Sequence, residues 1–285
     1  TAVTVRVLGA PAPDVAYAVE LARRLRLSHH ILSVSRPALM RALVPTIRIL
    51  KSFDPMEIRN SVAAYLGLRE ARRLGIRSVY TGDGGDEVFC GYSFLFGKYS
   101  AELKTYQKRL FGFMRFSSVP LGRALGVRVE SPFLDRGLMR MALKLPRRWL
   151  IQKRHGTPIG KWAVRKALEG DLPDRFVWRE NLPIEYGSGT TILRRWLAEP
   201  ADRRAFARAK PAVLKRDGIR LRDPEQWHYY TIYCRLFGPP KPARAGVPAC
   251  VACHSCLSHP ESRFCTTCGE WPATESHPEG RATTS

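Results

Sequence analysis

The sequence predicts an α/β protein followed by a small cysteine-rich module. The chain has 285 residues, of which 45% are hydrophobic and 25% charged, as is ordinary for a folded protein. Residues 3–25 and 76–92 each pass from a strand-like run through a turn into a helical pattern. Five of the seven cysteines lie together between residues 250 and 268, in a tail with too little apolar mass to fold unaided.

The first strand-then-helix stretch begins at residues 3–8, where a short apolar run predicts a strand. Residues 14–25 place their apolar side chains on one face of a helix. His29 and His30 follow, and we expect them to pack or to lie at a strand edge, because no acid or nucleophile neighbours them in sequence.

A long helix is predicted to begin after Asp54. Asp54 suits the N-cap, Pro55 the first helical position and Glu57 the capping-box position. Gly75 is expected to end this helix. Further helix starts are predicted at Asp135 and Asp223.

The second strand-like run, residues 76–81, leads directly into a glycine-rich acidic turn at residues 82–87. In a parallel α/β sheet this turn lies at the carboxyl ends of the strands, where ligands bind. Glycines let the backbone approach a ligand closely, and carboxylates are hard oxygen ligands suited to Mg²⁺. A solvated acidic turn without function is the alternative. The candidate ligand-binding residues are Gly82, Asp83, Gly84, Asp86 and Glu87.

Three sequence blocks resemble the synthetase domain of the asparagine synthetase family. Residues 81–92 read Thr-Gly-Asp-Gly-Gly-Asp-Glu-Val-Phe-Cys-Gly-Tyr, close to that family's Ser-Gly-Glu-Gly-x-Asp-Glu-x-Phe-x-Gly-Tyr. Residues 131–135 read Ser-Pro-Phe-Leu-Asp, and residues 161–167 read Lys-Trp-Ala-Val-Arg-Lys-Ala, similar to the family's Lys-x-x-x-Arg-x-Ala. The order and spacing of the blocks agree, and the resemblance extends over about residues 3–190.

The resemblance implies a doubly wound parallel sheet of the adenine-nucleotide alpha-hydrolase type with a helical C-terminal part. It also implies an ATP-dependent ligase that activates a carboxylate as an acyl-adenylate, releases pyrophosphate and lets ammonia attack. Aspartate is the default carboxylate, and other carboxylates remain open. By the same resemblance Asp86 would hold Mg²⁺ and Lys161 would neutralise charge on the leaving pyrophosphate. Asp83, where many relatives have glutamate, would take the proton of the nucleophile or orient it.

Simpler structural roles are open for several of these residues. Lys161 and Arg165 stand four residues apart and would share one exposed helix face. For Asp135 and Tyr92 we expect a helix cap and a core position. Asn181 stands where many relatives have lysine.

Two segments of the relatives have no counterpart in the sequence. The strand that ends in Ser-Gly-Gly-x-Asp-Ser and cradles the ATP phosphates would precede Val3, and the glutaminase domain would precede that strand. We therefore expect an N-terminally truncated synthetase, with a natural degenerate paralogue as the alternative. Ammonia would come from solution or from a glutaminase partner, and a homodimer is also open.

The cysteine-rich tail predicts a zinc ribbon. Cys253-x-x-Cys256 and Cys265-x-x-Cys268 have the spacing of a structural four-thiolate site, although Cys250-x-x-Cys253 would serve equally well as the first pair. The candidate ligands are thus Cys250, Cys253, Cys256, Cys265 and Cys268, with His254 and His259 as weaker substitutes. Disulfides are the alternative, which the absence of a secretory signal disfavours.

Composition divides the chain into four segments. We expect a synthetase domain at residues 1–238, a proline-rich linker at 239–249, the zinc ribbon at 250–271 and a disordered tail at 272–285. The formal charge of +22 falls within residues 1–238. This charge indicates either solvated arginine-rich faces or a surface for nucleic acid.

Other classes of function remain open on these grounds. A basic RNA-binding or tRNA-modifying protein and an inactive regulatory paralogue are the alternatives to a ligase. No apolar run approaches the roughly 18–20 residues that span a bilayer, so we expect no membrane insertion and a cytoplasmic protein.

Overall fold

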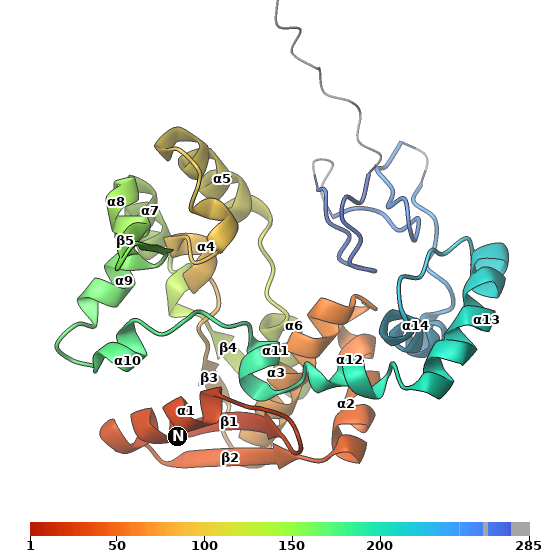
Figure 1. Cartoon of the computed structure of the whole chain (residues 1–285), viewed down its shortest axis with the longest axis horizontal. Coiled ribbons are helices and arrows are strands. Elements are labelled where there is room, and N and C mark those ends of the chain that lie inside the picture. Colours follow the sequence, from red (N-terminus) through yellow and green to blue (C-terminus); the bar gives the residue numbers. More distant parts are fainter. Residues whose placement is uncertain (245, 259–261, 275–285) are drawn as a thin grey trace, which may run out of the picture. The chain divides into compact units, whose positions relative to one another are not determined.

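The computed structural model describes residues 1–244, 246–258 and 262–274 (Figure 1). The chain forms two compact units. Unit 1 combines Thr1–Gly67 with Ile184–Ser285, and unit 2 is Leu68–Pro183. Unit 1 is therefore built from the two ends of the chain, whereas the domain boundaries at residues 238 and 249 stay a prediction.

Unit 1 contains one two-stranded parallel sheet and a set of helices. Strand β1 pairs with β2 so that Val3, Val5 and Val7 lie opposite His30, Leu32 and Val34. The elements of this unit are β1 (Ala2–Val7), α1 (Asp14–Arg24), β2 (His29–Val34), α2 (Arg36–Leu50), α3 (Pro55–Arg73, which continues into unit 2), α11 (Ile184–Ser188), α12 (Ile192–Trp196), α13 (Pro200–Asp217) and α14 (Pro224–Phe237).

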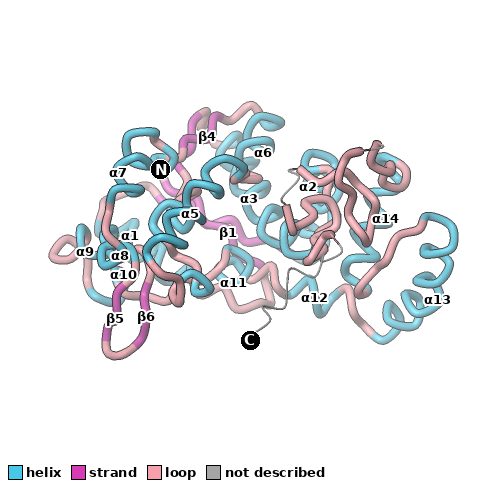
Figure 2. Tube along the Cα trace, turned by 90° about the horizontal axis from the view of Figure 1, so that it is seen from above, coloured by secondary structure: helices cyan, strands magenta, loops and turns pink. Residues whose placement is uncertain are grey.

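The core of unit 1 lies where α2, α3 and α14 pack together. Leu43 and Ile47 of α2 and Tyr230 of α14 are fully or almost fully buried. The ring of Phe53, between α2 and α3, meets the rings of Tyr230 and Tyr233 edge-on, each at 5.2 Å between centroids. Figure 2 shows the loop-rich C-terminal segment lying over α2 and α14.

Unit 2 contains a short parallel pair of strands, an antiparallel hairpin and several short helices. Its core is formed by α4, α5, α7 and α8, with Phe89, Leu103 and Leu150 almost fully buried. The elements are β3 (Ser78–Tyr80), α4 (Gly85–Phe89), the 3-10 turn η1 (Ser93–Leu95), α5 (Ser100–Phe113), α6 (Ser118–Leu125), β4 (Arg128–Glu130), the 3-10 turn η2 (Pro132–Leu134), α7 (Arg136–Lys144), α8 (Arg147–Leu150), β5 (Gln152–Arg154), β6 (Thr157–Ile159), α9 (Trp162–Ala167) and α10 (Asp174–Val177).

The predicted helix starts are confirmed. Asp54 accepts hydrogen bonds from the backbone amides of the first turn of α3. Asp135 accepts one from Leu138 and Asp223 one from Gln226, which satisfies amides that lack a partner within the helix. Gly75 follows α3 with a left-handed backbone, at a φ of 78°.

The sheets are smaller than the sequence predicts. Within the described residues, β1–β2, β3–β4 and β5–β6 form three separate two-stranded sheets. Strands β3 and β4 pair over only three residues each, and they belong to a different unit from β1 and β2. The protein is thus a mixed α/β structure, and the doubly wound sheet stays a prediction. Nowhere in the described part of the chain does a helix combine the length and apolarity needed to cross a bilayer.

Candidate functional site

The acidic turn in unit 2 follows strand β3. The backbone amide of Thr81 donates to the carbonyl of Glu130 at 2.9 Å, which extends the β3–β4 pairing into the turn. Gly84 directly precedes α4 as its N-cap residue and has a φ of 88°, a conformation that glycine adopts without strain. A side chain at Gly84 would also overlap that of Leu134. This glycine is therefore required both by the backbone and by packing.

Asp83 is held by hydroxyl groups. The hydroxyls of Thr81 and Ser118 donate to its Oδ2 atom, the first at 2.9 Å. The hydroxyls of Thr81 and Ser131 are 3.1 Å apart, so they are also bonded to each other. These donors fix the orientation of the Asp83 side chain. Asp83 is a predicted site residue, whereas the roles of Ser118 and Ser131 could not be read from the sequence.

Asp86, Lys161 and Asn181 form a closed triangle of polar contacts. Lys161 Nζ lies 3.0 Å from Asp86 Oδ1, and the two side chains are 20% and 28% exposed. Asn181 Nδ2 donates to the same oxygen at 2.7 Å, while Lys161 Nζ donates to Asn181 Oδ1 at 2.7 Å. The structure therefore brings together two predicted site residues, and it adds Asn181, which the sequence marked only as a departure from relatives.

The backbone fixes Lys161 beside the turn. Its amide donates to the carbonyl of Phe89 at 3.0 Å, and its φ of 57° is unusual for a residue with a side chain. A Cβ atom at Gly160 would overlap the carbonyl oxygen of Cys90, and one at Gly91 would overlap Asp86 Oδ1. Two glycines thus allow the close approach that places the ammonium group next to the carboxylate.

Arg165 does not lie on an exposed helix face, contrary to one of the expected alternatives. It is partly buried and donates to the carbonyls of Gly160, Val177 and Arg179. Burial lowers the pKa of Arg165 from its usual value, with Asp86 opposing this effect. The side chain therefore joins the segment that carries Lys161 to the segment that leads to Asn181.

Glu87 and Tyr92 form a separate pair behind the turn. The Tyr92 hydroxyl donates to Glu87 Oε1 at 2.5 Å, and the ring packs against the core of unit 2, as expected for Tyr92. Burial raises the pKa of Glu87 above its usual value, although the hydrogen bond from Tyr92 opposes the shift. Glu87 thus anchors α4 to the core, and Asp83 and Asp86 are the better oxygen donors for a ligand.

Asp83 and Asp86 offer oxygen donors of the kind that Mg²⁺ prefers. Among the described residues, three or more metal-binding side chains converge only at a cysteine cluster in unit 1, so the acids of the turn do not form a complete cage. Protein-bound Mg²⁺ usually takes one or two carboxylates, keeps several waters and adds substrate phosphates. Partly exposed Asp86 suits this arrangement.

That cysteine cluster contains four of the five predicted metal ligands. The sulfur atoms of Cys250, Cys253, Cys265 and Cys268 all lie within 4.8 Å of one another, and all four residues are buried. Hydrogen bonds from the other three thiols lower the pKa of Cys250. Cys256 is exposed and lies outside the cluster.

The other predictions for the C-terminal segment concern its two histidines and the residues after the ribbon. The Nε2 atom of His254 lies 3.1 Å from the carbonyl oxygen of Gly218, so this ring contacts backbone and is not part of the cluster. Ala273 is fully buried, and its amide donates to the carbonyl of Arg263 at 2.8 Å. Ala273 thus packs with the ribbon segment, and the boundary at residue 271 stays a prediction. His259 and residues 275–285 lie outside the described part of the chain.

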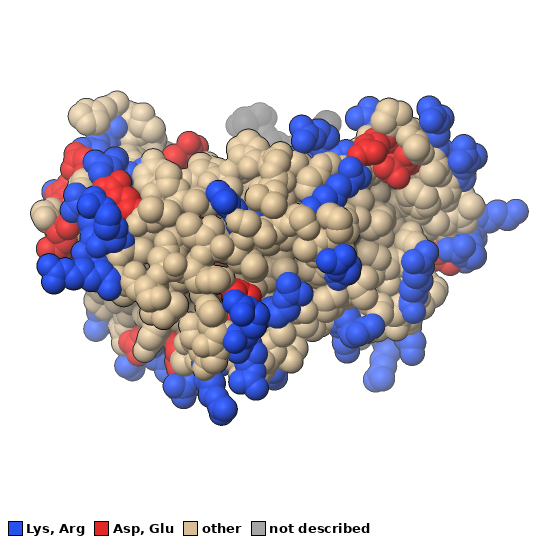
Figure 3. All heavy atoms as spheres, turned by 90° about the horizontal axis from the view of Figure 1, so that it is seen from below, with Lys and Arg blue, Asp and Glu red and all other residues tan. Residues whose placement is uncertain are grey.

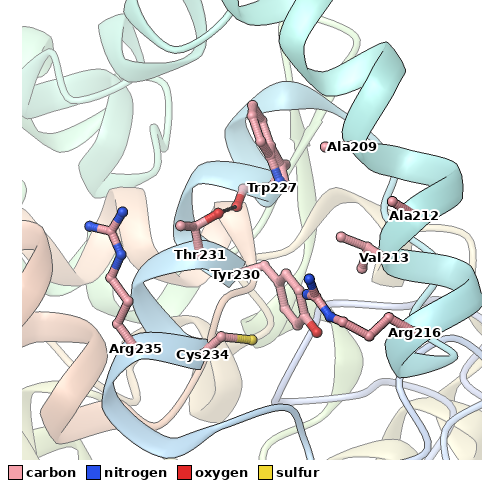
Figure 4. Close-up of a pocket in the computed structure, with 9 residues that line it drawn as sticks. All are labelled: Ala209, Ala212, Val213, Arg216, Trp227, Tyr230, Thr231, Cys234 and Arg235. Carbon is pink, nitrogen blue, oxygen red and sulfur yellow. Dashed lines mark hydrogen bonds between the residues drawn. The ribbon is translucent and has the colours of Figure 1, made fainter.

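A hollow of about 420 Å³ lies between α13 and α14 (Figure 4). Its lining is largely apolar, with the thiol of Cys234 among the side chains. Burial raises the pKa of that thiol, which makes it a poor nucleophile. A second hollow of about 480 Å³ is bordered by the first turns of α3 and α14 and by Phe264 and Gly269. Neither hollow contains a predicted site residue.

The chain belongs to the asparagine synthase family, whose family model matches residues 1–120 and 120–221. Similar proteins include an asparagine synthetase (glutamine-hydrolyzing) from Zea mays, 29% identical over 188 residues, which are 62% of this chain and 32% of that protein. Another from Oryza sativa subsp. japonica is 27% identical over 258 residues, covering 85% of this chain and 42% of the relative. One from Arabidopsis thaliana is 26% identical over 289 residues, which cover 95% of this chain and 47% of that protein. The chain spans less than half the length of these relatives.

Proposed function

We propose that the chain is the synthetase part of an ATP-dependent amide-forming ligase and that the residues around Asp86 handle the nucleotide. Family membership supports the class of reaction. The triangle of Asp86, Lys161 and Asn181 carries the residue assignment, because it holds a carboxylate and an ammonium group side by side at the end of a strand. Aspartate as the acceptor, the doubly wound sheet and a cytoplasmic location belong to the same proposal.

Each residue has a defined role in this mechanism. Asp86 would bind Mg²⁺, which offsets the negative charge of the phosphate oxygens when it is bound. Lys161 would stabilise the charge that develops on the departing pyrophosphate, and its fixed backbone keeps the ammonium group in place beforehand. Asp83, oriented by two hydroxyls, would accept a proton from the attacking ammonia. Ammonia would come from solution or from a glutaminase, as the names of the relatives suggest.

The test is magnesium-dependent release of pyrophosphate from ATP, measured with and without aspartate and ammonium. The assay uses this chain and a version extended at its N-terminus by a strand ending in Ser-Gly-Gly-x-Asp-Ser. Lys161→Met should lower the rate by roughly 10²–10³-fold, because one preorganised electrostatic contact is lost. Lys166→Met is the matched control, since Lys166 lies in α9, which begins directly after Lys161 in sequence, and forms a partly exposed pair with Glu169. Equal rates in the two variants, or no release from either chain, would contradict the proposal.

The RNA-binding alternative rests on charge. Figure 3 shows lysine and arginine side chains scattered over one face, mostly near its margins, with broad uncharged areas and fewer acidic side chains between them. An RNA affinity that falls steeply with salt would support that alternative, which otherwise stays a prediction.

A further inference from the structure

We propose that Cys250, Cys253, Cys265 and Cys268 bind one structural Zn²⁺ ion and that this ion stabilises the starts of α3 and α14. The match to the family model ends at residue 221, before the first of these cysteines. The inference does not depend on the ligase activity.

The sulfur positions fit a tetrahedral ion. Cys250 and Cys268 have their sulfur atoms 3.6 Å apart, and the same distance separates those of Cys253 and Cys265. Four sulfurs at about 2.3 Å from a central zinc lie roughly 3.8 Å from one another, whereas a disulfide requires about 2.05 Å. The observed spacing therefore matches thiolates around one ion.

The backbone identifies which cysteines pair in sequence. The amide four residues after Cys250 donates to the Cys250 carbonyl at 2.8 Å, and the amide four residues after Cys265 donates to the Cys265 carbonyl at 2.7 Å. The amides of Cys250 and Cys265 donate in turn to the carbonyls five residues later, at 3.0 and 3.1 Å. His254 and Gly269, which follow the second cysteine of each pair, both have left-handed backbones. The two Cys-x-x-Cys turns are thus copies of one geometry, and Cys256 is left out.

The segment needs a cross-link to keep this shape. In residues 246–258 and 262–274 the structure contains no helix, and the buried hydrophobic side chains other than cysteine are small in number. They are Ala252, Leu257 and Ala273. Such a core is too small to hold the turns by itself, so the ion would supply the missing stability. A set of four thiolates has no open position, which favours a structural role over a catalytic one.

The second turn is bonded to the helices of unit 1 through four successive carbonyls. The hydroxyl of Ser52 donates to Thr266 at 2.8 Å and the amide of Phe53 donates to Thr267 at 2.7 Å. Gln226 Nε2 donates to the carbonyl of Cys268 at 2.8 Å, and Arg222 Nη1 to that of Gly269 at 2.8 Å.

Three of the four donors are buried. Ser52 is 2% exposed, and Phe53 and Gln226 are fully buried. If the turns lost their ion and unfolded, the amide of Phe53 and the side chain of Gln226 would lose their hydrogen-bond partners. A buried donor without a partner destabilises the fold by its uncompensated desolvation. Zinc binding and the order of the starts of α3 and α14 are therefore linked.

Metal analysis tests the ligand set on the full chain. We expect one zinc per purified chain, retained in Cys256→Ser and lost in Cys253→Ser and Cys268→Ser. Iron in place of zinc, or two disulfides found by thiol counting under denaturing conditions, would overturn the assignment. If the ligand variants do not fold, the Cys256→Ser chain is stripped of metal and loaded with Co²⁺. Absence of the visible bands of tetrahedral thiolate-bound Co²⁺ in the reduced protein would then overturn the assignment as well.

Hydrogen exchange tests the link to the helices. Removal of zinc by a chelator should speed exchange of the amides in residues 52–58 and 224–230 by at least about tenfold, and should lower Tm by more than about 10 °C. Amides of α5 in unit 2 serve as the internal control and should change less. Unchanged protection of residues 52–58 and 224–230 after zinc removal would show that the ribbon is independent of the helices, which contradicts the inference.

Discussion

The guanidinium Nη1 atom of Arg59 donates to Glu225 Oε2 at 2.7 Å in the interior of unit 1. Arg59 Nε also donates to Glu185, and the exposed fractions of the three side chains are 2%, 5% and 6% for Arg59, Glu225 and Glu185. Helix α3 is thereby joined to α11 and α14, segments from opposite ends of the chain.

Arg59→Met should destabilise the protein by about 3–5 kcal/mol. Two buried carboxylates would lose the cation that compensates their desolvation, and this loss exceeds what the attraction itself contributes. Urea denaturation measures the change. Arg24→Met is the control, because Arg24 pairs with Glu20 on the surface and its loss should cost no more than about 1 kcal/mol. Similar costs for the two variants would contradict the prediction.

Asp54→Asn should flatten the dependence of stability on pH. Burial raises the pKa of Asp54 from 3.8 to about 6, with Glu57 adding to the shift and Arg222 opposing it. The folded protein then binds this proton more tightly than the unfolded chain, so stability falls as the pH rises from about 4 to about 6. Between pH 5 and pH 7 the free energy of unfolding of the wild type should fall by roughly 1 kcal/mol relative to that of the variant. The asparagine of the variant can still cap α3, so loss of the cap does not add to the difference. Urea midpoints at both pH values measure this, and parallel curves would refute it.

Gly160→Ala should reduce pyrophosphate release by at least about tenfold. The added methyl group would overlap the carbonyl of Cys90 and move Lys161 away from Asp86, and displacements of about 1 Å have effects of this size. Gly112→Ala is the control, since its Cβ atom would meet open space on α5 and should raise stability by up to about 1 kcal/mol. Full activity of Gly160→Ala would show that the position of Lys161 does not matter.

Gly269→Ala should separate docking of the ribbon from metal binding. Its Cβ atom would overlap Asp54 Oδ1, and its φ of 77° adds strain of about 1–2 kcal/mol. We expect the variant to keep zinc but to lose protection of the amides at the starts of α3 and α14 against hydrogen exchange. Gly246→Ala has a similar φ of 79° with open space around the Cβ atom, so it reports strain alone. Equal protection in the two variants would exclude a role of Gly269 in docking.

The parts of the structure that depend on neighbouring residues could be predicted from sequence. Asp54, Asp135 and Asp223 cap their helices through bonds to amides two or three residues away, and those bonds follow from local geometry. The acidic turn after β3 was predicted for the same reason. Cys-x-x-Cys spacing predicted a thiol cluster, but two cysteine pairs were equally good until the fold placed Cys256 on the surface.

The rest depends on contacts between distant segments. Asn181 reaches Asp86 across 95 positions of sequence, and Ser118 reaches Asp83 across 35. No periodicity or local motif encodes such pairs. The extent of the sheets depends likewise on which strands meet, so apolar runs predicted strands without predicting that they would form separate pairs.

The hydroxyl of Ser52 and its acceptor at Thr266 are separated by 214 positions in the chain. During synthesis, residues 52 and 53 therefore emerge long before the segment that covers them. Unit 2 is continuous in sequence and can fold while the chain is still growing, whereas unit 1 closes only after its last segment has left the ribosome. Loop closure over such a distance slows folding, so metal capture by residues 250–268 would be among the last steps in the folding of unit 1.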